Sequence, residues 1–312
     1  MKRKYLYIIL VLIQAFIFLN ACRKSTGTNS SDTVISTEIT SNNISSGENS
    51  SSETEVKKEK VNSSVAQSAV GETDRGKTTQ PTESHSVSET KTDTAAVFSE
   101  QAAATSAGEI KYCLYTPKNP QKNMPLIIYL HGGTSKGNDL SKLTEIDGFP
   151  QYLKNGMLGD VRAYVIMPQL TSDKKGWTDV SVGIREIIDK TTETYGIDKT
   201  KVSLTGHSMG GTGTWALAAE NPDLFWRIAP LSGSAALNAE NVNALKNISV
   251  RAFVGADDII VKPQSSKAFV AALKKVGGNA EITEFEGADH FAVPKLAYCT
   301  AGTDLLDWLA GK

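Results

Sequence analysis

The stretch KVSLTGHSMGGTGTWALAAE (residues 201–220) decides the fold of this chain. Its first five residues have the composition of a short strand, and residues 209–220 have the length and composition of a helix that ends before Asn221-Pro222. Between them lies Gly206-His207-Ser208-Met209-Gly210, a G-x-S-x-G pattern on a strand-to-helix turn. Such a turn lifts a serine hydroxyl above the edge of a sheet. Ser208 is therefore predicted to be a nucleophile, the alternative being a simple helix N-cap.

Outward from this turn, strand and helix patterns alternate. Strands are predicted where short apolar runs end at Gly, Pro or a polar residue: 109–115, 125–130, 163–167, 201–205, 227–231, 250–254 and 280–285. Helices are predicted at 180–194, 209–220, 264–276 and, for the most part, 294–310. Alternation of this kind predicts an α/β fold, a mostly parallel sheet with helices on both faces. The segment between residues 231 and 250 is too short for a separate cap domain.

A serine hydroxyl needs a base to become nucleophilic, and histidine is the usual base near neutral pH. The chain has four histidines. His85 lies in a polar segment, while His131 and His207 lie inside backbone motifs. His290 remains, in Gly287-Ala288-Asp289-His290 just after the last predicted strand. We therefore predict His290 as the base; the alternative is a histidine of a surface loop.

The base in turn needs an acid that holds the imidazole in the useful tautomer. The acid is expected at the end of the preceding strand, where the sequence has Gly255-Ala256-Asp257-Asp258. Either aspartate satisfies this requirement. Asp289, beside the predicted base, is interpreted as a loop residue.

Acyl transfer passes through an oxyanion that needs aimed N–H donors. We predict the backbone N–H of Met209, which follows the serine, and a second donor from His131-Gly132-Gly133-Thr134, which follows a buried strand. Gly133 is favoured and Thr134 is the alternative. His131 is expected to order this loop. Trp177 and His207 are the predicted substrate contacts, although a tryptophan is as often a core residue.

Four of these motifs carry a resemblance. LHGG (130–133), GHSMGG (206–211), GADDIIV (255–261) and GADH (287–290) resemble the α/β-hydrolase superfamily over residues 109–312. KGNDL (136–140), GFPQYL (148–153) and VIMPQ (165–169) resemble a group of serine esterases near predicted peptidases, phospholipase/carboxylesterases, dienelactone hydrolases and feruloyl-type esterases. The resemblance implies a hydrolase that needs no cofactor. In these hydrolases the acid is the fourth residue of a G-x-x-D-x-x-V turn, which favours Asp258 over Asp257.

Composition divides the 312 residues into unequal parts. Residues 22–107 are rich in Ser, Thr, Glu, Lys and Asn and have no apolar periodicity, which predicts a disordered tether. Residues 108–312 are then one catalytic domain with a sizeable core. Lys and Arg total 33 against 34 Asp and Glu, a net charge of −1. This balance argues against a nucleic-acid partner, which a basic face would attract.

The first 21 residues have the features of an export signal. Lys2, Arg3 and Lys4 precede an apolar run over residues 5–19, which is short for a membrane span. The run ends in Leu19-Asn20-Ala21-Cys22, which resembles a bacterial lipobox. Lipidation of Cys22 is therefore predicted, with the protein exported and anchored to the bacterial membrane at the cell surface. An uncleaved anchor with an incidental cysteine is the alternative.

Beyond Cys22 the chain has Cys113 and Cys299. An exported domain can oxidise such a pair, but spacing alone does not decide between a disulfide and two buried thiols. His, Cys and Asp residues show no metal-ligand spacing, so no metal site is predicted.

The sequence thus predicts a monomeric, surface-tethered serine hydrolase that cleaves carboxylic esters. Acylated polysaccharide is the expected substrate class, because a site without a cap suits polymers. Two alternatives remain: a serine peptidase with the same three residues, and a non-catalytic binding lipoprotein on the same fold.

Overall fold

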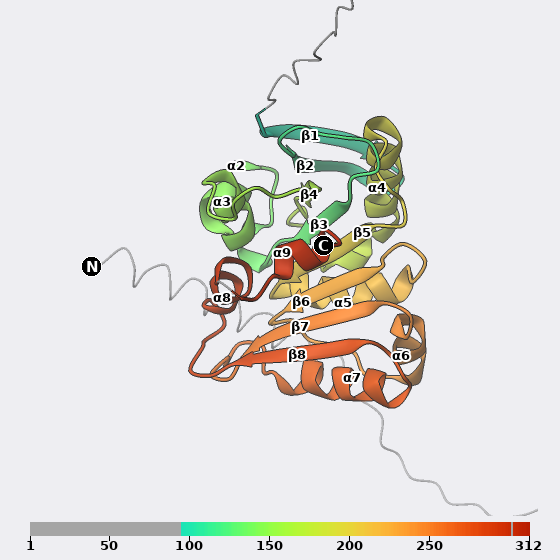
Figure 1. The fold of residues 1–312 in the computed structure, drawn as a ribbon, viewed down its shortest axis with the longest axis vertical. Helices are drawn as coiled ribbons and strands as arrows, with labels where there is room; N and C mark the ends of the chain where they lie inside the picture. Colours follow the sequence, from blue (N-terminus) through green and yellow to red (C-terminus); the bar gives the residue numbers. More distant parts are fainter. Residues whose placement is uncertain (1–94, 301) are drawn as a thin grey trace, which may run out of the picture. The chain divides into compact units, whose positions relative to one another are not determined.

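In a computed structural model, which describes residues 95–300 and 302–312, eight strands form one sheet in the order β1-β2-β4-β3-β5-β6-β7-β8 (Figure 1). Strand β2 pairs antiparallel with β1 and β4, and the remaining neighbours pair parallel. The strands are β1 (Val97–Thr105), β2 (Gly108–Thr116), β3 (Leu126–Leu130), β4 (Tyr164–Pro168), β5 (Val202–His207), β6 (Arg227–Leu231), β7 (Ser249–Gly255) and β8 (Ala280–Phe285).

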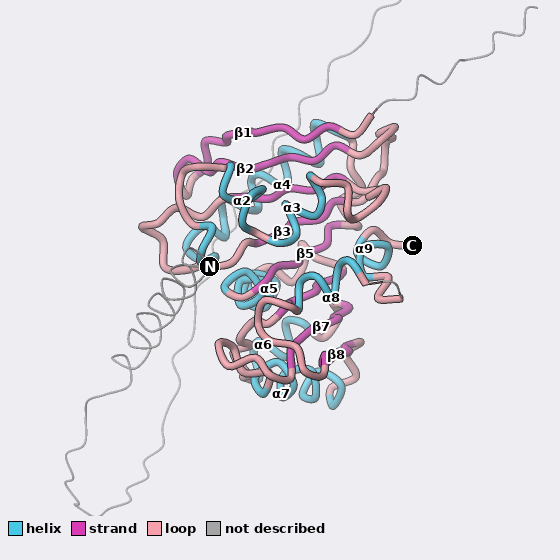
Figure 2. The backbone as a smooth tube through the Cα atoms, turned by 90° about the vertical axis from the view of Figure 1, so that its left-hand side faces the viewer, coloured by secondary structure: helices cyan, strands magenta, loops and turns pink. Residues whose placement is uncertain are grey.

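Helices cover both faces of this sheet (Figures 1 and 2). One face carries α4 (Ser181–Tyr195), α5 (Met209–Glu220), α6 (Ala239–Leu245) and α7 (Gln264–Lys275); the other carries α2 (Ser141–Ile146), α3 (Gly148–Lys154), α8 (Val293–Cys299) and α9 (Leu305–Leu309). Two short 3-10 turns, η1 (Gly133–Ser135) and η2 (Trp177–Val180), follow β3 and β4. The predicted α/β-hydrolase architecture, without a separate cap domain, is confirmed in the described residues.

Each face of the sheet has its own hydrophobic core, because side chains alternate along a strand. In β3, Leu126, Ile128 and Leu130 face the core under α4, α5 and α7. Ile127 and Tyr129 face the core under α3, α8 and α9. A strand buried on both faces needs an unbroken apolar run, which explains the sequence PLIIYL.

The predicted tether boundary at residue 107 is wrong. Residues 97–105, assigned to the tether, form strand β1, which pairs along its whole length with β2 from Val97↔Thr116 to Thr105↔Gly108. Most of its side chains are small or polar and exposed, and Ala103 is its buried residue. An edge strand held by backbone hydrogen bonds therefore carried no apolar pattern to predict it.

At the other end of the domain, the helix predicted over residues 294–310 is interrupted. Helix α8 ends at Cys299 and α9 begins at Leu305, with Asp304 in the left-handed region at φ 43°. Helices α2, α3 and α6, each of six or seven residues, were not predicted. The predicted signal segment and residues 22–94 of the predicted tether, including Cys22, lie outside the described residues.

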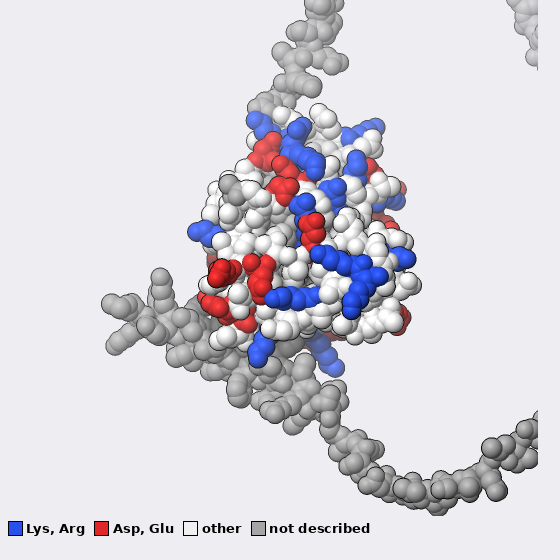
Figure 3. Space-filling model, turned by 60° about the horizontal axis from the view of Figure 1, so that its bottom comes forward, with Lys and Arg blue, Asp and Glu red and all other residues white. Residues whose placement is uncertain are grey.

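Both signs of charge occur on the face near β8 and α7 (Figure 3). Lys267 of α7 and Glu284 of β8 form an ion pair there, with Nζ and Oε2 2.8 Å apart. Among the described residues, no helix is long and apolar enough to cross a membrane.

Candidate active site

Ser208 occupies a strained turn between β5 and α5. Its φ is 60° and its ψ is −119°, a region that residues other than glycine rarely adopt. The end of strand β6 holds this turn, because the Ser208 N–H donates to the Leu231 carbonyl at 3.0 Å. A Cβ at Gly210 would lie 1.9 Å from the Leu130 carbonyl oxygen, and one at Gly206 would lie 2.6 Å from it. The close approach of β3 therefore requires glycine at positions 206 and 210.

His290 and Asp258 come together from the ends of β8 and β7. His290 Nδ1 lies 2.7 Å from Asp258 Oδ2, and both residues are only 3% exposed. The other carboxylate oxygen of Asp258 accepts the N–H groups of Ile260 and Val261 at 3.0 and 2.8 Å. These two hydrogen bonds orient the carboxylate so that its second oxygen points to the imidazole.

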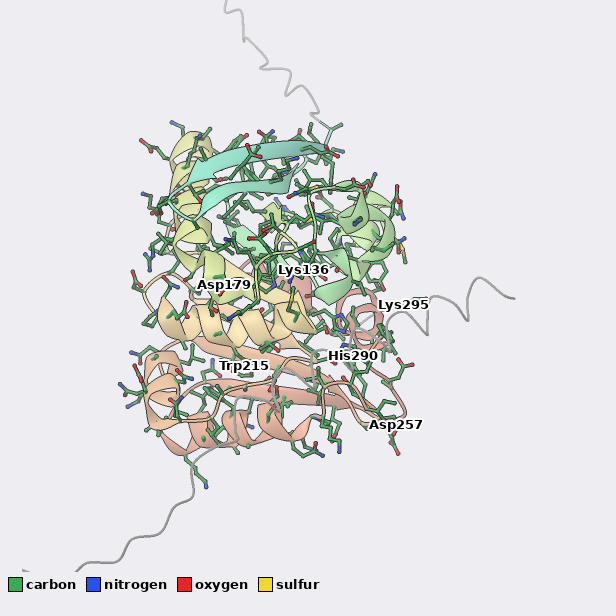
Figure 4. The ribbon with its side chains drawn as sticks, turned by 180° about the vertical axis from the view of Figure 1, so that it is seen from behind. Lys136, Asp179, Trp215, Asp257, His290 and Lys295 are labelled. Carbon is green, nitrogen blue, oxygen red and sulfur yellow. The ribbon has the colours of Figure 1, made fainter. Side chains whose placement is uncertain are left out.

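The two other aspartates near this pair have different surroundings. Asp257 is exposed, and Figure 4 shows it with His290 and Lys295 at the side of the sheet where β7 and β8 end. Asp289 is also exposed, and its Oδ1 accepts the N–H groups of Phe291 and Ala292 at the start of α8. Of the three aspartates, Asp258 is the one hydrogen-bonded to the His290 ring.

The Asp258 carboxyl is stabilised as a carboxylate despite its burial. Burial raises the pKa of this group, but the hydrogen bond and charge of His290 and the Val261 N–H lower it more, so that the net pKa lies below its ordinary value. An ionised acid at Nδ1 leaves the other ring nitrogen of His290 available for proton transfer.

His207 links the serine turn to His290. Its Nε2 donates to the His290 backbone carbonyl at 2.8 Å, and the two rings lie 4.6 Å apart. Burial, followed by the nearby His290, lowers the pKa of His207 to about 3, so its ring is neutral at physiological pH. This half-buried ring thus contacts the loop that carries His290, and the substrate contact predicted for His207 stays a prediction.

The serine and histidine loops are thus neighbours. Among the hydrogen bonds of the described residues, none joins Ser208 Oγ to His290. Hydrogen bonds between catalytic groups commonly shorten only when substrate binds.

The loop after β3 lies directly against the serine. A Cβ at Gly132 would lie 3.6 Å from both the Ser208 Cβ and the His207 carbonyl oxygen. The next two residues, Gly133 and Thr134, are exposed at the start of η1. Met209 is the first residue of α5, where backbone N–H groups lack intrahelical partners. The predicted oxyanion donors therefore lie on two segments that adjoin Ser208.

His131 and Trp177 support this loop from inside the domain. His131 Nε2 accepts the Leu170 N–H at 2.9 Å, and its Nδ1 then donates to the Gly132 carbonyl at 2.6 Å. Burial lowers the pKa of His131 to about 4. Trp177 donates its indole N–H to the His131 carbonyl at 3.3 Å and is only 2% exposed. Its ring packs on Gly213, so we assign Trp177 to the core beneath the loop in place of the predicted substrate contact.

Asp147 is a member of the site that sequence reasoning did not identify. It lies between α2 and α3 and is 6% exposed. Its carboxylate accepts hydrogen bonds from the Tyr129 hydroxyl, from the Gly132 N–H at 3.2 Å and from the Ser135 hydroxyl at 3.0 Å. The one signal in the sequence, an aspartate directly before Gly148-Phe149-Pro150 at the start of a short helix, resembles an ordinary helix cap.

Cys113 and Cys299 are free thiols. Burial raises the pKa of the Cys113 thiol to about 12, which makes it a poor nucleophile. Within residues 95–300 and 302–312, His, Cys, Asp and Glu form no cluster able to hold a metal ion.

The chain is similar in sequence to known esterases. Residues 103–275, more than half of the chain, match the esterase family described as "Putative esterase". The chain belongs to this esterase family. It is 28% identical over 144 residues to "Poly(3-hydroxyalkanoate) depolymerase C" of Paucimonas lemoignei, and 32% identical over 126 residues to "Probable acetylxylan esterase A" of Aspergillus flavus.

These matches are partial. They cover 41% and 37% of this chain, and the chain spans 32% and 39% of the length of the two relatives. A solved structure of a thermostable esterase superposes with a TM-score of 0.59 at 27% identity, covering 68% of this chain and 62% of that one. The chain therefore shares its family with esterases over residues 103–275, and its fold with the thermostable esterase over 68% of its length.

Proposed function

We propose that this protein hydrolyses carboxylic esters through an acyl-enzyme on Ser208, with His290 as the base and Asp258 as the orienting acid. The observation that carries the proposal is the 2.7 Å contact between His290 Nδ1 and Asp258 Oδ2, buried beside a serine turn at positive φ. Membership of the esterase family supports the reaction class.

The proposed reaction has two halves. Ser208 Oγ attacks the ester carbonyl while its proton passes to His290 Nε2, and the oxyanion accepts the N–H groups of Met209 and of Gly133 or Thr134. The intermediate collapses when the C–O bond to the alcohol breaks, and His290 returns the proton to the leaving alcohol. Water then attacks the acyl-enzyme by the same route and releases the acid.

An acylated polysaccharide is the proposed substrate. The segment between β6 and β7 holds only the short helix α6, so no separate domain of residues 95–300 and 302–312 covers the site. A shallow pocket of about 590 Å³ opens beside the turn that holds Asp258, lined by Ser234, Ile260, Val261, Lys262, Gln264 and Ser265. The hydroxyl, amide, ammonium and aliphatic groups of this lining offer both polar and apolar contacts to a sugar ring. The names of two relatives refer to polymeric esters.

We further propose that the enzyme is exported and anchored at the cell surface by a lipid on Cys22, through a tether that ends where β1 begins. The support is the basic, apolar and lipobox-like order of residues 1–22. Cys22→Ala is expected to move the protein from the membrane fraction to the medium. Retention of the variant in the membrane fraction would favour an uncleaved anchor.

The test of the activity is a panel of p-nitrophenyl esters, acetylxylan, feruloyl esters and peptide amides. We expect release of acetate from acetylxylan, abolished in Ser208→Ala and unchanged in Ser172→Ala, a serine on an exposed loop. Cleavage of amides without esters would favour the peptidase alternative. Absence of turnover on every substrate would favour the binding lipoprotein.

A further inference from the structure

Asp147 has the position of a helix cap but not its hydrogen bonds. It is the N-cap residue of α3, where an aspartate normally accepts an N–H of the first helical turn. Its side chain makes no such bond. Both oxygens point elsewhere, to Tyr129 on one side and to Gly132 and Ser135 on the other.

Placing this carboxylate in the interior has a cost. Its three donors are all uncharged groups, and an ionised group buried without a cation is unfavourable. Burial accordingly raises the pKa of Asp147, although the three hydrogen bonds oppose the rise. The groups that this carboxylate binds would lose their acceptor if an apolar residue replaced it. Those groups therefore show what the buried carboxylate does in the fold.

What it holds is the loop that lies against the nucleophile. The Gly132 N–H is directed into Asp147, while the Gly132 Cα faces the Ser208 Cβ. Three residues further on, the Ser135 hydroxyl meets the same carboxylate oxygen, and Gln169 Nε2 donates to the Ser135 carbonyl at 2.9 Å. The Ser135 N–H closes the turn onto the Gly132 carbonyl at 3.3 Å. Both ends of the turn are therefore fixed, and its exposed middle is Gly133-Thr134.

We propose that Asp147 is a positioning residue for the oxyanion hole: it binds both ends of the Gly132–Ser135 turn and so aims the N–H groups of Gly133 and Thr134 at the carbonyl that Ser208 attacks. This inference rests on the proposed function. It predicts that the conformation of the Gly132–Ser135 turn, as well as the stability of the fold, depends on a hydrogen-bond acceptor at residue 147.

Four variants separate these effects. Asp147→Leu fills the space without an acceptor. Asp147→Asn keeps one acceptor oxygen for Gly132 and Ser135 and offers an N–H to the Tyr129 oxygen. Tyr129→Phe removes a hydrogen bond from the same carboxylate without touching the loop. Ser135→Ala removes one loop contact and leaves the carboxylate in place, and it serves if Asp147→Leu does not fold.

The first readout is the rate at which a fluorophosphonate modifies Ser208, followed by intact mass. In this reaction the Ser208 Oγ–P bond forms, the P–F bond breaks, fluoride leaves and the hydroxyl proton passes to His290; the phosphonyl oxygen takes the place of the oxyanion. We expect Asp147→Leu to react about 10²-fold more slowly, as for loss of an oxyanion donor or its misplacement. Ser135→Ala is expected to react roughly fivefold more slowly, the equivalent of one neutral hydrogen bond.

Asp147→Asn and Tyr129→Phe are expected to react near the wild-type rate, although Tyr129→Phe melts at a lower temperature. A wild-type rate in both Asp147→Leu and Ser135→Ala overturns the proposal. So does an equal slowing in Tyr129→Phe, which would reduce Asp147 to a structural role.

The second readout is amide hydrogen exchange over residues 131–137, which needs no activity. We expect faster exchange there in Asp147→Leu, or in Ser135→Ala if it is used, than in Tyr129→Phe. If wild-type Ser208 is not modified but this difference appears, the proposed function fails and the control of the loop by Asp147 stands. If neither modification nor the difference in exchange appears, both proposals fail.

Discussion

Acidification is expected to destabilise the folded protein through its buried histidines. His131 is fully buried and neutral, because its Nε2 must accept the Leu170 N–H. Its folded pKa of about 4 lies below the ordinary value of 6.5. The unfolded chain therefore binds a proton that the folded chain does not. The stability that depends on the neutral ring is complete above pH 6.5 and is lost as the pH falls toward 4.

The size of the effect follows from these two pKa values. Between them, each pH unit lowers the free energy of unfolding by about 1.4 kcal/mol. From pH 7 to pH 5, His131 alone is expected to lower it by about 2 kcal/mol. His207 acts in the same direction, since burial lowers its pKa also. Asp147 acts in the opposite direction, because burial raises its pKa.

The assay is urea unfolding at pH 7 and pH 5 for wild type and His131→Gln, whose amide oxygen can accept the Leu170 N–H. Comparing the two proteins cancels the contributions of His207 and Asp147. The variant is expected to be less stable than wild type at pH 7, but its loss of stability between the two pH values should be smaller by about 2 kcal/mol. An identical loss in both proteins would refute a neutral, hydrogen-bonded His131.

Three further outcomes are expected. Gly210→Ala places a Cβ 1.9 Å from the Leu130 carbonyl oxygen, so it should lose about 3 kcal/mol or more in thermal or urea unfolding. Gly176→Ala, where a Cβ meets nothing within 4 Å, should stay within about 0.5 kcal/mol of wild type, and equal losses in the two variants would contradict the reasoning. Asp258→Asn should lower kcat on p-nitrophenyl acetate by about 10⁴-fold, with Asp257→Asn near normal; the reverse order would exchange their roles. A chain that begins at Gly108 should melt well below one that begins at Ala95, because it exposes the edge of β2, and equal melting temperatures would argue that β1 is dispensable.

Much of the sheet could be predicted because buried parallel strands need unbroken apolar runs. PLIIYL marked β3 for this reason, and helix α5 begins at Met209 and ends at Glu220 as expected. Gly206 and Gly210 belong to the local motif around Ser208, and each allows a close approach of the Leu130 backbone. Strand β1 lacked any such signal, because its pairing depends on backbone groups that every residue carries.

The site was predictable where a residue type is scarce or a motif is local. Elimination among four histidines indicated His290, and the structure places it against Asp258. The contacts of His207, Trp177 and Asp147 could not be predicted in the same way. Each depends on which segment lies across from it in the fold: His207 contacts the loop after β8, Trp177 contacts Gly213 of α5, and Asp147 contacts a turn after β3.

The central claim is that Ser208 carries the acyl group. The most direct measurement is intact-mass and peptide-mapping analysis of the protein mixed with p-nitrophenyl acetate and quenched within the first turnover. The account predicts one acetyl group on Ser208, formed with a burst of p-nitrophenol, absent in Ser208→Ala and strongly delayed in His290→Ala. The account would be contradicted if Ser208→Ala turned over the ester at the wild-type rate. It would also be contradicted if the acetyl group were found on another residue.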